Sequence, residues 1–269
     1  LRRVIGLDND AIADTFDAWN EGPLQSFLIE ITAKIFRVRD KETNKSLVDL
    51  VLDQAGSKGT GKWTVEAALE QGVAVPSIAA ALDARVVSSQ KQARVKLAQH
   101  YPDPPKTAVS GDRNQRVAQV HDALLAAKIC AYAQGMELID AGSKTYDWNI
   151  DRKEVARIWK GGCIIRAKML DTIMQAFEKD KSLHNLVADQ TLGNDVRKSL
   201  PAFRELVASS MIQGIAIPAM SASLTWLDGV RSAELPQNLT QAQRDAFGAH
   251  TYIRRDREQG GAMHSDWLK

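Results

Sequence analysis

The sequence lacks the features that mark several classes of protein. Its only two cysteines, Cys130 and Cys163, lie in separate apolar segments, without a C-x-x-C motif and without a histidine at zinc-ligand spacing. No apolar run approaches the ~18–20 residues of a membrane span, and no charged-then-apolar signal peptide opens the chain. We therefore expect no disulfide framework, no metal site and no contact with a membrane, and we expect both cysteines to be buried thiols in a reducing cytoplasm.

An excess of charge of one sign is missing as well. The 269 residues include 35 Lys and Arg against 33 Asp and Glu, for a net charge of +2. Proteins whose main task is to bind nucleic acid or an anionic membrane carry a larger excess, so we expect no nucleic-acid partner, and any bound anion requires a local cluster of cations. With 44% hydrophobic and 25% charged residues, the composition is that of a globular protein and excludes intrinsic disorder.

Apolar residues at helical spacing are present almost throughout the chain. No series of alternating strands with hairpin turns interrupts them, and only the run from Ser46 to Leu52 resembles a strand. The sequence therefore predicts an all-α fold. We interpret the proline-rich segment from Tyr101 to Asp112 as a surface connection within one domain of residues 1–269. The predicted helices cover residues 24–35 after Gly22-Pro23, residues 78–97 after Pro76, a long helix of about Arg113 to Ile139, residues 165–177 and residues 203–211.

The helical pattern contains an internal repeat. Trp19-x-x-Gly22 precedes one apolar helix, and Trp159-x-x-Gly162 precedes another about 140 residues later. The second copy follows the long predicted helix, whereas the first copy has only a few residues before it. If the two halves are equivalent, a long helix belongs upstream of Leu1.

The most unusual stretch is G-S-K-G-T-G-K-W, from Gly56 to Trp63, with three glycines and two lysines. Such a loop can turn its N–H groups and a lysine toward an anion. It nearly matches the nucleotide-binding pattern G-x-x-x-x-G-K-[ST], but Trp63 stands where a Mg²⁺-ligating hydroxyl is required, and no parallel-sheet pattern surrounds it. We therefore set an NTPase aside and keep two interpretations, an anion-binding loop or a flexible turn with solvated lysines.

Three residues elsewhere, Arg244, His250 and Arg85, are further candidates for binding an anion. A helix would place Arg244, Phe247 and His250 nearly in line, where the arginine fork and the histidine donor suit a phosphate or a carboxylate. The alternative is a solvated arginine and a core histidine beside Tyr252. Arg85 lies on an otherwise apolar helix, where it either needs a partner or extends to solvent at the edge of the apolar stripe.

The pattern K-x-x-H-N at Lys181, His184 and Asn185 contains residue types that are useful for proton transfer. An acid would be needed one turn beyond His184, and that position is Ala188. We interpret this segment as the polar start of a helix.

Several segments stand out along the chain: K-G-T-G-K-W from Lys58, A-R with S-S after it from Ala84, G-C-I-I-R from Gly162, P-x-N-L-x-Q from Pro236, and Q-A-Q-R-D-x-F-G-A-H-T-Y from Gln241. Together they resemble the 6-phosphogluconate dehydrogenase family over essentially the whole chain. The closing H-x-x-W at His264 also fits, and the short ending resembles the bacterial form of the family.

The resemblance implies oxidation of 6-phosphogluconate with NADP, loss of CO₂ and formation of ribulose 5-phosphate in the pentose phosphate pathway, without a metal. It implies that Lys58, Thr60 and Arg85 bind the substrate. It also implies that Arg244 and His250 reach into the active site of the other subunit of a homodimer. The chain would then be a helical domain that binds substrate and forms the dimer.

The resemblance further implies that the family's Rossmann coenzyme domain, and the helix with the lysine base and the glutamate acid, lie before Leu1. We therefore expect no catalytic residue in this chain and an inactive isolated fragment. The alternative is a helical dimerisation module without a ligand of its own.

Overall fold

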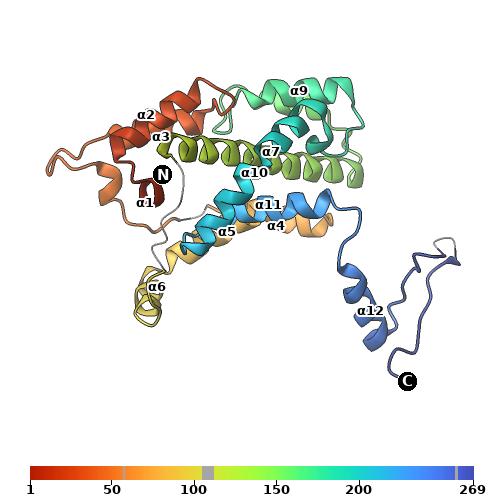
Figure 1. Ribbon diagram of the computed structural model, residues 1–269. Helices are drawn as coiled ribbons and strands as arrows, with labels where there is room; N and C mark the ends of the chain where they lie inside the picture. Colours follow the sequence, from red (N-terminus) through yellow and green to blue (C-terminus); the bar gives the residue numbers. More distant parts are fainter. Residues whose placement is uncertain (57, 105–111, 258–259) are drawn as a thin grey trace. The chain divides into compact units, whose positions relative to one another are not determined.

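The computed structural model describes residues 1–56, 58–104, 112–257 and 260–269, which fall into two compact units, Leu1–Trp226 and Leu227–Lys269. The described residues form helices and isolated β-bridges but no strand, which confirms the all-α prediction (Figure 1). The helices are α1 (Arg2–Ile5), α2 (Asn9–Asn20), α3 (Phe27–Arg37), η1 (Leu47–Leu50), α4 (Thr60–Glu70), α5 (Pro76–Ser89), α6 (Lys91–Ala98), α7 (Arg113–Thr145), α8 (Arg152–Ile158), α9 (Met169–Lys179), η2 (Leu186–Ala188), α10 (Gln190–Ile212), α11 (Pro218–Val230) and α12 (Gln237–Gly248).

The core of the first unit forms where α7 and α10 pack against each other. Alanines on α7 allow Phe203 and Val207 of α10 to approach closely, and Leu224 of α11 completes the cluster. Each of the two helices begins at an aspartate, because the carboxylates of Asp112 and Asp189 accept hydrogen bonds from N–H groups of the first turn. The long predicted helix is thus confirmed, and it continues to Thr145.

A buried polar contact joins α5, α7 and α11. Gln134 is fully buried, and its side chain accepts a hydrogen bond from Ser77 N (3.0 Å) and donates one to Ser77 Oγ (2.7 Å). Ser77 Oγ lies 2.6 Å from Ser223 Oγ. This contact fixes the orientation of α5, the helix that carries Arg85.

The run from Ser46 to Leu52 resembles a strand in sequence but does not form one, in agreement with the all-α prediction. Residues Leu47–Leu50 form a 3₁₀ helix, and the only pairing of this run is one isolated bridge between Ser46 and Arg39. A strand requires a partner along its length, and the described residues supply none here, so the β-propensity of the run has no effect.

Several helix boundaries also differ from the prediction, and two of these differences have a clear local cause. The helix expected directly after Gly22-Pro23 begins only at Phe27, because the residues between form a turn. The single helix expected over residues 78–97 is divided at Gln90 into α5 and α6. The hydroxyls of Ser88 and Ser89 bond back to carbonyls of the last turn of α5, at 2.8 and 2.7 Å, and thereby compete with continuation of the helix.

The two copies of the repeat occupy corresponding places. Trp19 and Trp159 each lie at the end of a helix, and a turn leads from each to the next helix. The segments after the turns meet at an antiparallel bridge between Ser26 and Ala167. Within it, Phe27 N donates to Arg166 O and Lys168 N donates to Gln25 O, each at 3.0 Å. The long helix expected upstream of the first copy stays a prediction.

The cysteines behave differently from each other. Cys130 is fully buried, which confirms the predicted burial of this residue, and burial raises the pKa of its thiol to about 12. Cys163 is only half-buried, because it lies in the irregular segment after α8 rather than on a packed helix face. Among the described residues, no helix is both long enough and apolar enough to cross a membrane.

Candidate functional site

The glycine-lysine loop leads directly into α4. Ser57 and residues 105–111 of the predicted surface connection lie outside the described residues. Lys58 and Thr60 are exposed, and Thr60 is the first residue of α4. The N–H groups of a first helical turn lack partners within the helix, so they add partial positive charge where the loop that contains Lys58 enters α4. The exposed loop thus presents a lysine, a hydroxyl and a helix N-terminus together.

The end of α5 holds this loop in place. Arg85 donates a hydrogen bond from Nη2 to the carbonyl oxygen of Gly56. Ala55 N donates to Ser88 Oγ and Gln54 Nε2 donates to Ser89 O, both at 3.0 Å. The structure therefore brings Arg85 to the loop that carries Lys58 and Thr60, as an exposed side chain that bonds to a carbonyl of that loop.

A second set of contacts fixes the base of the loop. Asp53 accepts hydrogen bonds from Lys91 (2.5 Å) and Arg94 (3.1 Å) of α6. The bonds from Lys91 and Arg94 lower the pKa of Asp53 to about 2. Nothing in the sequence pattern points to Asp53 and Arg94, because these contacts join residues about 40 positions apart that share no helical spacing.

The second lysine of the loop, Lys62, forms an ion pair within α4. Lys62 lies 3.3 Å from Glu66, one turn along α4, and both side chains are exposed. The solvated-lysine interpretation therefore holds for Lys62. The segment before the loop is the 3₁₀ helix η1, whereas a nucleotide-binding P-loop follows a strand.

Substitution of Gly59 tests how strictly the loop depends on its backbone. Gly59 has φ of 103°, a conformation that L residues rarely adopt, although an added Cβ would meet only ordinary contacts. We expect Gly59→Ala to lower the free energy of unfolding by about 1–3 kcal/mol. Denaturant unfolding measures this, with Gly61→Ala within α4 as the matched control, since its Cβ also has room and alanine favours a helix interior. An equal effect of both substitutions would contradict the assignment of strain to Gly59.

A large cavity of about 950 Å³ lies beside α4 in the first unit. Its walls are mainly apolar side chains of α3, α4 and α7, and Thr60 and Trp63 line it from α4. Lys128 of α7 also lines it, with a long contact of 3.4 Å from Nζ to the Leu24 carbonyl oxygen. Burial lowers the pKa of Lys128 to about 8. No spacing rule singled out Lys128, because a lysine within a helical pattern is expected on the solvated face.

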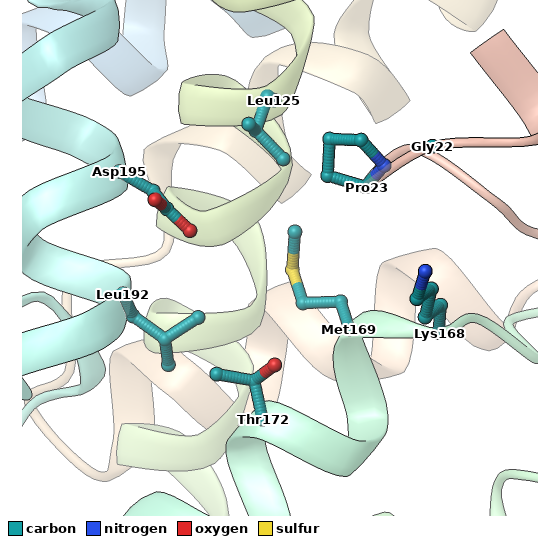
Figure 2. Close-up of a pocket in the computed structure, with 8 residues that line it drawn as sticks. All are labelled: Gly22, Pro23, Leu125, Lys168, Met169, Thr172, Leu192 and Asp195. Carbon is teal, nitrogen blue, oxygen red and sulfur yellow. The ribbon is translucent and has the colours of Figure 1, made fainter.

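A smaller cavity of about 210 Å³ lies elsewhere in the first unit, beside the turn after α2. Figure 2 shows the polar ends of Lys168, Thr172 and Asp195 around a hollow that is otherwise lined by apolar groups. None of the predicted site residues lines it.

Arg244 and His250 belong to the second unit. Arg244 is exposed on α12, and its Nη1 donates to Gln241 Oε1 at 3.0 Å. The prediction of a helix through His250 was wrong, because α12 ends at Gly248 and Ala249 takes a left-handed conformation (φ 49°). The core-histidine alternative was also wrong, since His250 is exposed.

The turn beyond α12 nevertheless keeps His250 close to the helix. Its ring lies edge-on to Phe247, with ring centroids 5.9 Å apart. A Cβ at Gly248 would lie 2.9 Å from the His250 ring, so only glycine leaves room for the imidazole over the helix end. Within its own unit, the structure therefore presents Arg244 and His250 as exposed cation and donor at one end of α12.

The K-x-x-H-N segment has a structural role. Asn185 accepts a hydrogen bond from Val187 N (3.0 Å) at the start of η2 and donates one to Glu137 (3.1 Å). His184 is exposed, with Nε2 3.8 Å from Glu137. The interpretation as a polar helix start is confirmed for this short 3₁₀ helix. In the part of the chain that the structure describes, no group of three or more His, Cys, Asp or Glu is placed to hold a metal ion.

The arrangement of these groups can be compared with known proteins. The family model of the 6-phosphogluconate dehydrogenase C-terminal domain matches residues 1–267. The decarboxylating 6-phosphogluconate dehydrogenase of Synechococcus elongatus is 49% identical over 270 residues, which cover 100% of this chain and 57% of that protein. The NADP(+)-dependent, decarboxylating enzyme of Bacillus subtilis is 44% identical over 269 residues, with 100% and 57% covered.

A solved structure of the same family is also similar to this chain. The 6-phosphogluconate dehydrogenase of Plasmodium falciparum, studied in its apo form, with its cofactor NADP+ and with its substrate 6-phosphogluconate, matches with a TM-score of 0.94 and 43% identity. The match covers 99% of this chain and 57% of that one. The chain thus spans little more than half the length of these relatives, and the resemblance inferred from the motifs is confirmed. The chain belongs to the 6-phosphogluconate dehydrogenase family and corresponds to its C-terminal domain.

Proposed function

We propose that this chain is the substrate-binding and dimerising part of a decarboxylating 6-phosphogluconate dehydrogenase. The full-length protein would convert 6-phosphogluconate to ribulose 5-phosphate and CO₂ and reduce NADP in the cytoplasm. The observation that carries the proposal is the exposed loop with Lys58 and Thr60 at the start of α4, held by Arg85, in a chain that matches the family from end to end.

The proposed roles follow from charge. The substrate carries a phosphate and a carboxylate, and Lys58, Arg85 and Arg244 supply the cations that such groups require in a site. Thr60 offers a hydroxyl at the positive end of α4, and His250 offers a ring donor. These residues bind and orient the substrate, which lowers the entropic part of the barrier for the reacting groups.

We further propose a homodimer with shared active sites, in which Arg244 and His250 of one protomer complete the site of its partner. The exposed position of both side chains at the end of α12 supports this role, since each is accessible to a second chain.

NADP supplies the hydride acceptor in this reaction. A dinucleotide site of the family type requires a strand, a glycine-rich turn and a helix, and the described residues contain no strand. The described residues therefore do not form a dinucleotide site of this type by themselves. We place the coenzyme site, and the acid and base, in the part of the full-length protein outside this chain, and we assign no catalytic residue here.

Single substitutions in the full-length enzyme test the proposal. We expect Lys58→Ala, Arg85→Ala and Arg244→Ala each to raise KM for 6-phosphogluconate at least about tenfold, because a lost charge-assisted hydrogen bond costs about 1.5–3 kcal/mol. KM for NADP stays unchanged. Lys45→Ala, at an exposed lysine of another loop, is the matched control and leaves both constants unchanged. An unaltered KM for 6-phosphogluconate in all three variants would overturn the proposal.

The alternative function is a helical dimerisation module without a ligand. Exposed apolar side chains, such as Leu28 and Ile35 on α3, favour it as surfaces that a partner could cover. Titration of the 269-residue chain with 6-phosphogluconate separates the two. Heat of binding supports a substrate-binding domain, and its absence, together with a dimer in solution, supports the module.

A further inference from the structure

Asp245 is a buried carboxylate next to Arg244, and no role was predicted for it. It is fully buried, and it is the buried residue of α12. The family resemblance points to its neighbour Arg244 and to His250, but an aspartate in the last turn of a polar helix gives no signal of its own. A buried carboxylate requires donors, and its donors show what it holds together.

The first set of donors lies in the turn that carries His250. Ala249 and Thr251, the two residues on either side of His250, both have positive φ, 49° and 61°. The left-handed conformation is unfavourable for both, and most of all for a β-branched residue such as threonine. Asp245 binds both residues, because its carbonyl oxygen accepts from Ala249 N (2.9 Å) and its Oδ1 accepts from Thr251 N (2.8 Å).

The second set of donors lies at the end of the chain. His264 Nδ1 lies 3.0 Å from Oδ1 of Asp245, and Oδ2 accepts from Ser265 N (3.1 Å) and from Trp267 Nε1 (2.7 Å). Burial acts to raise the pKa of Asp245, but the hydrogen bonds from Trp267, His264 and the backbone outweigh it and hold that pKa well below its usual range. The carboxylate therefore stays charged and keeps all its donors.

Tyr252 ties the turn and the chain end together a second time. Its backbone pairs with that of Met263 through two hydrogen bonds of 2.9 Å, and its hydroxyl lies 2.7 Å from Ser265 Oγ. The strained turn and the chain end thus form one structure, with the Asp245 carboxylate at its centre.

We propose that Asp245 is a positioning residue for the substrate, which fixes His250 and Arg244 by joining α12, the turn beyond it and the chain end. This inference rests on the proposed function, in which these two side chains bind 6-phosphogluconate. Asp245 itself is fully buried and so acts through its neighbours.

The test is Asp245→Asn in the full-length dimeric enzyme. In either orientation, the amide replaces one acceptor oxygen by an NH₂ group, so at least one backbone donor, Thr251 N or Ser265 N, loses its partner. We expect KM for 6-phosphogluconate to rise about tenfold to a hundredfold, since small displacements of binding groups have effects of this size. KM for NADP stays unchanged. A purely structural role would lower the folded fraction and leave the KM of the folded enzyme unaltered, which would overturn the proposal.

Trp267→Phe provides a second variant that removes only one donor and keeps the ring. We expect a smaller rise of the same KM, and no additional rise when it is combined with Asp245→Asn, because both act on one contact. If Asp245→Asn does not fold, an unaltered KM in Trp267→Phe overturns the proposal. The control is Asp256→Asn, an exposed aspartate of the same unit that pairs with Arg254.

The failure of this inference can be told apart from failure of the proposed function. If Arg244→Ala raises KM for 6-phosphogluconate and the Asp245 and Trp267 variants do not, only the positioning role is wrong. If Arg244→Ala also has no effect, the proposed function is wrong.

Discussion

Mixed dimers of a Lys58→Ala subunit and an Arg244→Ala subunit of the full-length enzyme are expected to recover activity that neither homodimer shows at low substrate concentration. If Arg244 completes the site of the partner, each homodimer has two defective sites. In the mixed dimer, both defects fall in one site, and the other site has an intact Lys58 and an intact Arg244. The KM for 6-phosphogluconate of that site equals the wild-type value.

The measurement uses the two variants with different affinity tags, so that the mixed dimer can be purified and its KM determined. The control is a mixed dimer of Lys58→Ala and Arg85→Ala subunits. Both residues lie in the first unit at the same loop, so each site of this control has one defect and no recovery is expected. If the Lys58–Arg244 mixture also fails to recover, then Arg244 serves the site of its own subunit, and the shared site is refuted.

Lys128→Met is expected to stabilise the 269-residue chain at neutral pH. Burial lowers the pKa of Lys128 from its usual 10.5 to about 8, which means that the folded state disfavours the charged ammonium. At pH 7 the lysine is charged in both states, so the whole cost is present. We expect the substitution to raise the free energy of unfolding by about 2–3 kcal/mol, since each pKa unit corresponds to about 1.4 kcal/mol. The lost contact to Leu24 is long and contributes little.

The pH dependence of the free energy of unfolding tests whether the buried charge of Lys128 is the cause. Between about pH 8 and 10.5, the unfolded chain holds a proton on Lys128 that the folded chain has released, so the stability of the wild type rises with pH through this range. The difference between Lys128→Met and the wild type therefore closes as the pH approaches 10.5. Urea unfolding at a series of pH values measures it. The matched control is Lys144→Met on the same helix, whose side chain is 73% exposed, and destabilisation by Lys128→Met at pH 7 would contradict the prediction.

Helical periodicity was enough to predict the helices that have a regular apolar face. α7 has a clear start at Asp112 and a regular apolar pattern, so sequence alone predicts it. The composition of the segment from Gly56 to Trp63 predicted a loop between two helices but left open whether it binds an anion, and only the family resemblance implied a substrate role for Lys58 and Thr60. For Arg85, the apolar pattern left a buried and an exposed position open; the side chain is exposed, and its bond to a loop carbonyl could not be predicted from the pattern.

The features that could not be predicted depend on contacts between residues that are distant in sequence. The end of α12 at Gly248 follows from Ala249 and Thr251, two ordinary residues that are held at positive φ by Asp245. Intrinsic propensity gives no sign of such conformations, because tertiary hydrogen bonds impose them. Likewise, nothing in the local pattern shows that Lys128 lines a cavity, since burial of a helical lysine depends on which elements surround it.

The bridge between Ser26 and Ala167 also determines how well the chain tolerates insertions and deletions between these two residues. Two hydrogen bonds there close a loop that contains about half of the residues. The entropy of loop closure rises only with the logarithm of length, and each doubling adds only about 0.6 kcal/mol. Insertions between the two halves therefore weaken this contact very little. Surface connections within the loop are free to lengthen or shorten during evolution while the two copies of the repeat keep their junction.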